Sequence, residues 1–196
     1  MQFTLPAPRL QASVLDRVSF ALTKRQATPL MRVFHVVIGI AIVALLAQVR
    51  LQIGPVPITG QTFAVLLIGA TFGRGLAAIT LGGYVALGAL GAPIFTGAAG
   101  GLAALGGTTG GYLVGFIVAG WLLGRLAERG AFRQRSGALL AMAGAHVVIY
   151  ALGTAWLMYV LNVGVVTGVS LGVLPFVLGD TLKVVLAAEV LRAAHR

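Results

Sequence analysis

Long apolar runs alternate with short polar or glycine-rich segments along most of this chain. Six of these runs are long enough to form helices: residues 33–49, 61–72, 76–90, 109–126, 138–160 and 171–194. Most of them approach the roughly 20 residues that a helix needs to cross a bilayer. The pattern therefore predicts an all-α fold, an integral membrane bundle of six transmembrane helices.

The segment between the first two runs differs from the other connections. It contains Gly54, Pro55, Pro57 and Gly60, and two prolines so close together exclude regular helix. The run that follows, 61–72, would rise only about 18 Å against a hydrocarbon core about 30 Å thick. We therefore expect the proline-rich segment to enter the membrane. Irregular backbone at that depth lies only inside protein or beside a water-filled cavity, which is the first indication of a binding pocket.

The composition supports a membrane protein. Hydrophobic residues make up 59% of the chain and charged residues only 9%, whereas a soluble domain carries about 25% charged residues. The net charge of +10 would suggest nucleic acid as the partner of a soluble protein. Basic residues beside membrane spans instead orient the protein and contact anionic lipid headgroups, so we expect membrane lipid and no nucleic acid as a partner.

The basic residues also predict the orientation. In a six-span layout with both termini in the cytoplasm, only Arg50 lies outside and Lys183 lies within a span. Of the 14 lysines and arginines, the remaining 12 then lie inside: Arg9, Arg17, Lys24, Arg25, Arg32, Arg74, Arg125, Arg129, Arg133, Arg135, Arg192 and Arg196. This asymmetry follows the positive-inside rule. It predicts an N-in/C-in protein with a cytoplasmic arm at 1–31, including an amphipathic helix around 10–22, and a six-helix substrate-binding domain at 32–196.

Asp180 and Lys183 are the strongest candidates for chemistry. They lie three residues apart, and so on one face of the last predicted helix, inside an apolar run. A charged residue at the centre of a span costs roughly 2.5–3.5 kcal/mol on insertion scales. Two interpretations stay open: a salt bridge that locks helix packing, or the polar floor of a ligand pocket. Expected helix breaks at Pro175 and Gly179 favour the pocket, because they would free backbone groups at the same depth.

Further candidates lie mostly near the predicted outer ends of the spans. Hydroxyl, amide and aromatic side chains could contact a ligand, and glycines could let the backbone approach it. These candidates are Thr59, Gln61, Thr62, Tyr84, Phe95, Gly100, Gly101 and Tyr112. Tyr84 and Phe95 are expected to form apolar walls.

His146 and Tyr150 lie one helical turn apart in the fifth run. A proton relay and an interhelical hydrogen bond are both open interpretations of this pair. The only other histidines, His35 and His195, are too far away in sequence to form a metal-ligand pattern with it. The sequence therefore predicts no metal site.

Several activities are excluded by missing residues. The chain has no cysteine, which rules out disulfides, thiol catalysis and thiolate metal sites. It also lacks the phosphate-binding loop Gly-x-x-x-x-Gly-Lys-Ser/Thr, so it cannot hydrolyse ATP by that route. We therefore expect no cofactor and no enzymatic activity.

Several motifs in the loops occur in an order that resembles one family. They are Gly-Pro-Val-Pro-Ile-Thr-Gly-Gln-Thr at 54–62, Gly-Ala-Pro-Ile-Phe at 91–95, Gly-Gly at 100–101, and Thr-Gly-Gly-Tyr at 109–112. Together they closely resemble the biotin transporter BioY family. Gly179-Asp180 with Lys183 resembles that family's Pro-Gly-Asp-x-x-Lys signature. The similarity covers residues 32–194.

The resemblance implies a function. Members of this family are substrate-specific components of energy-coupling-factor (ECF) transporters, multi-pass proteins of the prokaryotic cytoplasmic membrane. They bind one vitamin under their outer loops and join a transmembrane coupling subunit and two ATP-binding subunits, although some work without that module. The resemblance thus implies high-affinity biotin binding and uptake. Asp180 would accept a ureido N–H, Lys183 would meet the carbonyl or carboxylate, and Phe95 and Tyr112 would form apolar walls.

The sequence departs from the family pattern at several positions. Leu178 and Thr108 stand where many relatives have proline, and Ala98-Ala99 replaces a Gly-Asn type pair. The second change removes one hydrogen bond to the ligand. The family's Ala-x-x-x-Ala coupling motif is also not clear in the first run, whose alanines are spaced by three.

Two alternatives to a biotin transporter subunit, and one question of assembly, stay open. One is a subunit of the same type for another vitamin. A second, of a different class, is an intramembrane enzyme that uses His146 or Asp180. The question of assembly arises because a homo-oligomer is compatible with the sequence.

Overall fold

The computed structural model describes residues 28–194, with side chains described to residue 193. The predicted amphipathic helix around 10–22 and most of the predicted cytoplasmic arm lie outside the described residues.

Helices dominate the described part of the chain. They are α2 (Pro29–Gln48), α3 (Gln61–Phe72), α4 (Arg74–Ala89), α5 (Leu102–Leu105), α6 (Gly110–Glu128), α7 (Arg135–Leu161), α8 (Val165–Gly172) and α9 (Leu174–Ala194), with a 3-10 turn η1 (Ala131–Arg133). Two short strands, β1 (Arg50–Leu51) and β2 (Ile58–Thr59), pair in antiparallel fashion. The predicted helical bundle is confirmed, with this small hairpin as an addition that the sequence did not predict.

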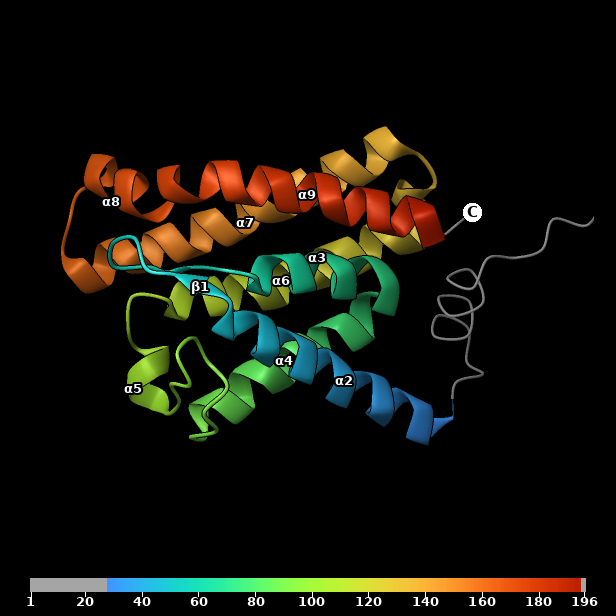
Figure 1. Ribbon diagram of the computed structural model, residues 1–196, viewed down its shortest axis with the longest axis horizontal. Coiled ribbons are helices and arrows are strands. Elements are labelled where there is room, and N and C mark those ends of the chain that lie inside the picture. The colour runs from blue at the N-terminus through green and yellow to red at the C-terminus, as the bar shows by residue number, and fades with distance from the viewer. Residues whose placement is uncertain (1–27, 195–196) are drawn as a thin grey trace, which may run out of the picture.

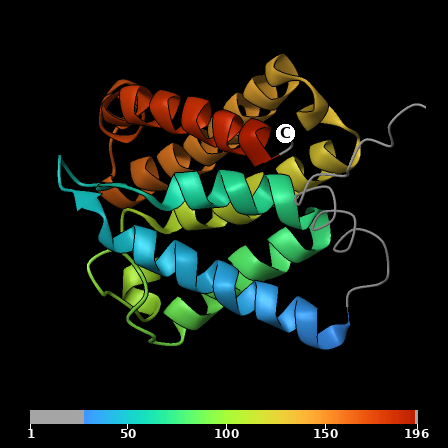
Figure 2. The same ribbon diagram turned by 45° about the vertical axis from the view of Figure 1, so that its right-hand side comes forward.

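The long helices run up and down along one axis. Figure 1 shows β1 and α5 at the left end of the molecule, and the start of α2 and the end of α9 at the right end. Figure 2 shows the same arrangement from a second direction. We call the left end, with β1, β2 and α5, the hairpin end, and the right end the terminal end. The described chain begins and ends at the terminal end.

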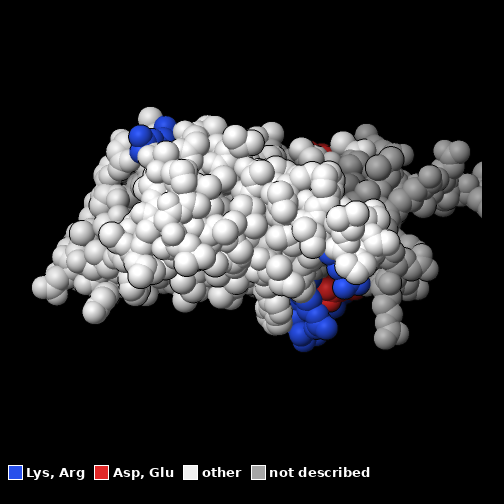
Figure 3. Space-filling view, turned by 90° about the horizontal axis from the view of Figure 1, so that it is seen from below, with Lys and Arg blue, Asp and Glu red and all other residues white. Residues whose placement is uncertain are grey.

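Within residues 28–194, three helices are long and apolar enough to cross a membrane, namely α2, α6 and α7. Helices α8 and α9 form a fourth candidate if this pair, bent by 41° at its break, is one span. Helices α3 and α4 are apolar but shorter. Figure 3 shows a face almost free of charge between a small basic patch at the hairpin end and a mixed charged group at the terminal end. Such a face suits lipid, where charged side chains are rare.

The break in the last apolar run lies at a different place from the one predicted. We expected a connection at 161–170 and a helix interrupted at Pro175 and Gly179. Instead, α8 occupies much of the expected connection, the chain breaks at Val173, and α9 continues through both residues. Proline fits the first turn of a helix, where its missing N–H forms no helical bond. The prediction that these residues interrupt the helix is therefore wrong, and the support that it lent to a pocket falls away.

The proline-rich segment forms the β1–β2 hairpin. Arg50 pairs with Thr59 and Leu51 with Ile58. The Gly60 N–H donates to the carbonyls of Leu46 (3.1 Å) and Val49 (3.0 Å), which ties the hairpin to the end of α2. The predicted non-helical backbone is confirmed here, and the hairpin places Thr59 and Gln61 beside the bundle interior.

Close helix packing depends on glycine at the contacts of α6. A Cβ atom at Gly69 of α3 would lie 2.7 Å from the Leu123 Cβ, and one at Gly115 would lie 3.0 Å from the Ile149 Cα of α7. Real Cβ atoms essentially never approach as closely as 2.7 Å and rarely as closely as 3.0 Å, so a larger residue at either position would require the neighbouring atoms to shift. Small residues at such crossings are typical of membrane bundles.

Candidate functional site

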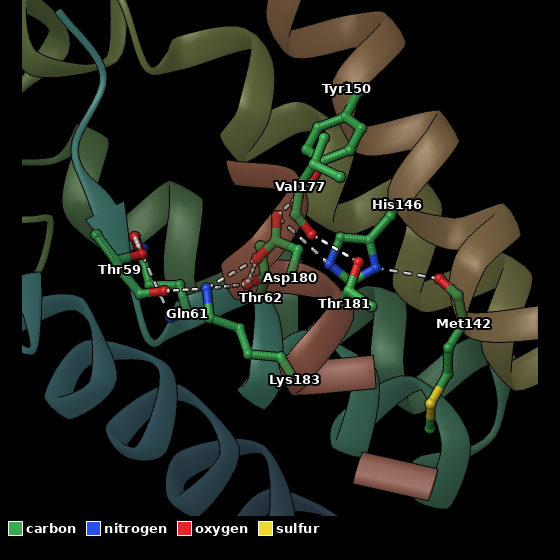
Figure 4. Close-up of polar contacts among 10 residues, drawn as sticks. All are labelled: Thr59, Gln61, Thr62, Met142, His146, Tyr150, Val177, Asp180, Thr181 and Lys183. Carbon is green, nitrogen blue, oxygen red and sulfur yellow. Dashed lines mark hydrogen bonds and ion pairs between the residues drawn. The ribbon is translucent and has the colours of Figure 1, made fainter. Parts of the chain in front are cut away.

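Asp180 lies near the hairpin end of α9, where α9 meets α3 and α7 (Figure 4). Its side chain is only 5% exposed. One carboxylate oxygen, Oδ1, accepts from Lys183 Nζ (2.8 Å) and Thr62 Oγ1 (2.9 Å), and the other, Oδ2, accepts from the Tyr150 hydroxyl (2.7 Å). Three helices thus supply donors to one buried carboxylate.

Lys183 connects the same helix to the hairpin. Its ammonium donates to Asp180 Oδ1, to Thr62 Oγ1 (2.9 Å) and to the backbone carbonyl of Thr59 (2.6 Å). A lysine ammonium has three N–H donors, so all three are used. The ion pair expected from the i, i+3 spacing is therefore formed, and it joins α9 to β2 and α3.

A cavity lies beside this ion pair. It is lined by Val56, Pro57, Thr59, Gln61, Thr62, Phe95, Thr96, Thr109, Tyr112, Leu113, Phe116, Ile149, Tyr150, Phe176, Asp180 and Lys183. Charged and hydroxyl groups are combined with aromatic and aliphatic walls, as is usual for small-molecule sites. The two interpretations of the charged pair therefore do not exclude each other, because the salt bridge is itself part of the cavity wall.

Most of the residues proposed from the sequence are brought together in the cavity wall. They are Asp180, Lys183, Tyr112, Gln61, Thr62, Thr59 and Phe95. Tyr84, Gly100 and Gly101 do not line the cavity.

Tyr84 lies behind the cavity rather than in its wall. It is fully buried, and its hydroxyl accepts from Gln61 Nε2 (2.8 Å) and donates to the Ile94 carbonyl (3.0 Å). Its ring meets the Phe95 ring edge to face at 5.5 Å between centroids. Tyr84 therefore positions Gln61 and Phe95, and the prediction that it forms an apolar wall is corrected.

Gly100 and Gly101 shape the loop that carries Phe95. The Gly101 N–H donates to the Gly88 carbonyl (2.7 Å), with a positive φ of 88° at Gly101 that favours glycine. A Cβ at Gly100 would clash with the Ala92 carbonyl. These glycines let the loop fold back on itself, rather than letting the backbone line the cavity.

The amide of Gln61 is fixed at both of its atoms. Its Oε1 accepts from Thr59 Oγ1 (2.9 Å) and Thr96 Oγ1 (3.2 Å), while Nε2 donates to Tyr84. Gln48 holds the loop from the other side, because its Nε2 donates to the Phe95 carbonyl (3.1 Å). The hairpin, α2 and the loop that carries Phe95 thus form one hydrogen-bonded cover over the cavity.

Sequence reasoning missed several lining residues, notably Tyr150, Thr96 and Phe176. Tyr150 was considered only as a partner of His146, although a hydroxyl inside an apolar run already required a hydrogen-bond partner. Phe176 gave no signal, because an aromatic residue in an apolar helix is as often turned towards lipid. Its ring lies 6.2 Å from that of Tyr112, whose hydroxyl donates to the Gly172 carbonyl (2.7 Å) beside the α8–α9 break.

His146 forms no interhelical hydrogen bond in the described part of the chain. Its Nδ1 lies 3.1 Å from the carbonyl of Met142 in its own helix, and its Nε2 lies 3.6 Å from Asp180 Oδ2. Of the pair His146 and Tyr150, it is therefore Tyr150 that forms an interhelical hydrogen bond, to Asp180 Oδ2, while His146 makes only a longer approach to the same oxygen.

The family relationship follows from the sequence as a whole. A model of the BioY family matches residues 19–196. The chain belongs to the BioY family. The resemblance drawn from the motifs at 54–62, 91–95, 100–101 and 109–112 is thereby confirmed. These motifs lie in the hairpin, the start of α3, the loop that carries Phe95 and the start of α6, and all but the one at 100–101 contribute residues to the cavity wall. No curated protein matches the sequence.

A solved structure supports the fold. The S-component for biotin from an ECF-type ABC transporter matches this BioY-family chain with a TM-score of 0.75 and 22% sequence identity. The match covers 85% of this chain and 93% of that one. The two proteins therefore share one fold.

The buried ion pair gives a prediction for stability. Lys183→Met leaves Asp180 as a buried charge without its cation, and breaking such a pair costs about 3–5 kcal/mol. We expect the Tm of the detergent-solubilised protein to fall by roughly 10 °C. The double variant Asp180→Asn/Lys183→Met removes both charges and is expected to regain most of this loss. Thermal unfolding measures both, and a double variant less stable than either single variant would contradict the account.

Proposed function

We propose that this BioY-family protein is the substrate-specific component of an ECF-type transporter, which binds biotin with high affinity and takes it up across the cytoplasmic membrane. Three findings support the proposal: membership of the family, the fold shared with a biotin S-component, and the composition of the cavity. The observation that carries it is the Asp180–Lys183 pair in the wall of a largely apolar cavity.

Biotin offers groups that complement this wall. Its ureido ring has two N–H donors and one carbonyl, and its aliphatic tail ends in a carboxylate. Asp180 is suited to accept a ureido N–H, and Lys183 to donate to the ureido carbonyl or the carboxylate. Phe95, Tyr112 and Phe176 supply rings against which the fused rings and the tail of biotin would pack.

Binding in this pocket exchanges hydrogen bonds rather than filling unused ones. Lys183 already donates to three oxygens, and Thr62 both donates to Asp180 and accepts from Lys183. A hydroxyl can rotate, so Thr62 is the member of the network best able to release its partners to a ligand. The free protein thus keeps its buried charges satisfied until biotin replaces part of the network.

The six apolar helices α2, α3, α4, α6, α7 and α9 are proposed to cross the membrane, with both termini in the cytoplasm. The segments at the hairpin end, 49–60, 90–109 and 161–173, contain Arg50 as their only lysine or arginine. Basic residues gather in the connections at the terminal end: Arg74, Arg129, Arg133 and Arg135. The positive-inside rule then places the hairpin end outside. Helix α3 is too short to cross the hydrocarbon core by itself, and the hairpin is proposed to span the remaining part.

The proposed partners follow from the same role. A transmembrane coupling subunit and two ATP-binding subunits would supply the energy for uptake, because this sequence has no phosphate-binding loop of its own. Membrane lipid would surround the apolar faces of α2 and α9. The protein would thus act as a transporter subunit rather than as an enzyme.

Binding experiments test the proposed site. We expect Asp180→Asn and Lys183→Met each to weaken biotin binding about tenfold or more, because a hydrogen bond to a charged group is worth roughly 1.5–3 kcal/mol. Isothermal titration calorimetry in detergent measures the affinity. Glu189→Gln is the matched control, because Glu189 is the other acid of α9 and pairs with Arg135 (2.8 Å) at the terminal end.

Two results would contradict the site. One is wild-type biotin affinity in both Asp180→Asn and Lys183→Met. The other is stronger binding of another vitamin to the wild-type protein, which would favour the alternative S component.

Cysteine labelling tests the orientation. The chain has no native cysteine, so single cysteines can be placed at Gln52 in the hairpin and at Arg133 in η1, both exposed. We expect a membrane-impermeant maleimide to label Gln52→Cys in intact cells and Arg133→Cys only after permeabilisation. The reverse pattern, or labelling of both from outside, would show the layout to be wrong.

Native mass spectrometry of the gently extracted protein tests the partners. We expect a complex whose mass equals this chain plus a coupling subunit, two ATP-binding subunits and one bound biotin. A homo-oligomer without these subunits would contradict the proposed assembly while leaving the biotin site in place.

A further inference from the structure

His146 is a buried histidine on α7 that the proposed binding of biotin does not use. Its side chain is 6% exposed. Nδ1 lies 3.1 Å from the Met142 carbonyl, and a carbonyl can only accept, so Nδ1 carries the hydrogen. In the neutral ring, Nε2 then carries a lone pair and can only accept a hydrogen bond.

This lone pair faces a carboxylate. Nε2 lies 3.6 Å from Asp180 Oδ2, and among the described residues it has no hydrogen-bond partner. Two acceptors thus point at each other in a buried place, which is unfavourable. A proton on Nε2 would turn the approach into a charge-assisted hydrogen bond, whose usual length of about 2.7–2.9 Å requires a shift of less than about 1 Å. Figure 4 shows His146 and Tyr150 of α7 both directed at this carboxylate, and both approach its Oδ2.

The other charged and titratable groups around His146 are few. Helix α9 contributes Asp180 and Lys183, α6 contributes Tyr112, and α7 itself contributes Tyr150. Helix α8 contains no titratable residue, and α3 contributes only the neutral Thr62. The remaining charges on the neighbouring elements lie towards the terminal end: Arg125, Glu128, Arg133, Arg135, Glu189 and Arg192.

The charge balance of the pocket therefore depends on His146. With a neutral imidazole, Asp180 and Lys183 cancel. An anionic ligand then brings one uncompensated negative charge into a site of low dielectric constant, where such a charge is costly. A proton on Nε2 restores neutrality and at the same time gives Asp180 a donor on the side away from Lys183.

We propose that His146 binds one proton together with each carboxylate-bearing ligand, so that the pocket takes up an anion and a proton as a pair. The proposal rests on the proposed function, since it needs a ligand with a carboxylate. By linkage, a proton taken up on binding makes affinity fall as pH rises, by about tenfold per pH unit wherever one whole proton is taken up per ligand.

Calorimetry measures this coupling directly. Titrations of the wild-type protein with biotin, in buffers of different ionisation enthalpy between about pH 6 and 9, give the number of protons taken up per ligand. We expect this number to rise towards one at the upper end, while affinity falls. Binding of biotin without proton uptake over this range overturns the proposal but leaves the proposed function intact. Absence of biotin binding refutes the proposed function, and the coupling to biotin with it.

A matched pair of variants identifies the proton acceptor. His146→Gln places a neutral amide donor near the position of Nε2 and is expected to abolish proton uptake and flatten the pH dependence of affinity. His35 makes the same local contact, with Nδ1 2.6 Å from the Met31 carbonyl, but meets the rings of Phe34 and Phe72. His35→Gln is therefore expected to keep the coupling. Proton uptake that persists in His146→Gln overturns the proposal.

A ligand without the charge provides a test that needs no variant. Biotin methyl ester lacks the carboxylate and is expected to bind the wild-type protein with little proton uptake and a weak dependence on pH. Equal proton uptake with biotin and with the ester would show that the negative charge of the ligand does not drive protonation, and would overturn the proposal.

Discussion

A buried carboxylate surrounded by apolar helices must be paired, and this requirement organises the hairpin end of the protein. An isolated charge in such a place would cost several kcal/mol. Asp180 avoids the cost through Lys183, Thr62 and Tyr150, which come from α9, α3 and α7. Because Lys183 also binds the Thr59 carbonyl of β2, satisfying one charge draws three helices and the hairpin together.

The same network determines where in the fold the site lies. The cavity lies where the polar groups are, and its cover is held by separate hydrogen bonds, from Gln48 to the loop at Phe95 and from Gln61 to Tyr84. The floor and the cover are linked at Thr59, which contacts both Lys183 and Gln61, and at the start of α3, where Gln61 of the cover is followed directly by Thr62 of the floor. A change at the ion pair can reach the cover through these residues.

The sequence predicted the helices and the charged pair because each left a strong signal. An apolar run predicts a membrane helix regardless of its neighbours, and opposite charges within such a run must meet. It did not predict which face of a helix each residue presents, because that depends on the rotation of packed helices. Tyr84 and Phe176 show the difference: Tyr84 was expected in the wall and lies behind it, whereas Phe176 was not expected and lines it. The break at Val173 was misplaced because proline is accepted in the first turn of a helix.

The two histidines of the described chain show that tertiary packing, rather than local sequence, creates the functional group at this site. His35 and His146 each follow a methionine by four residues, and each approaches that methionine's carbonyl through Nδ1. The helical backbone therefore offers the same i−4 carbonyl to Nδ1 in both. Only their tertiary neighbours differ: aromatic rings surround His35, whereas the Asp180 carboxylate faces His146. Lys183, in the cavity wall, approaches Oδ1 of this carboxylate, whereas His146, behind the wall, approaches Oδ2. A single acid is thus placed to respond both to a ligand and to a proton, and the packing of α7 against α9, rather than any motif, creates that arrangement.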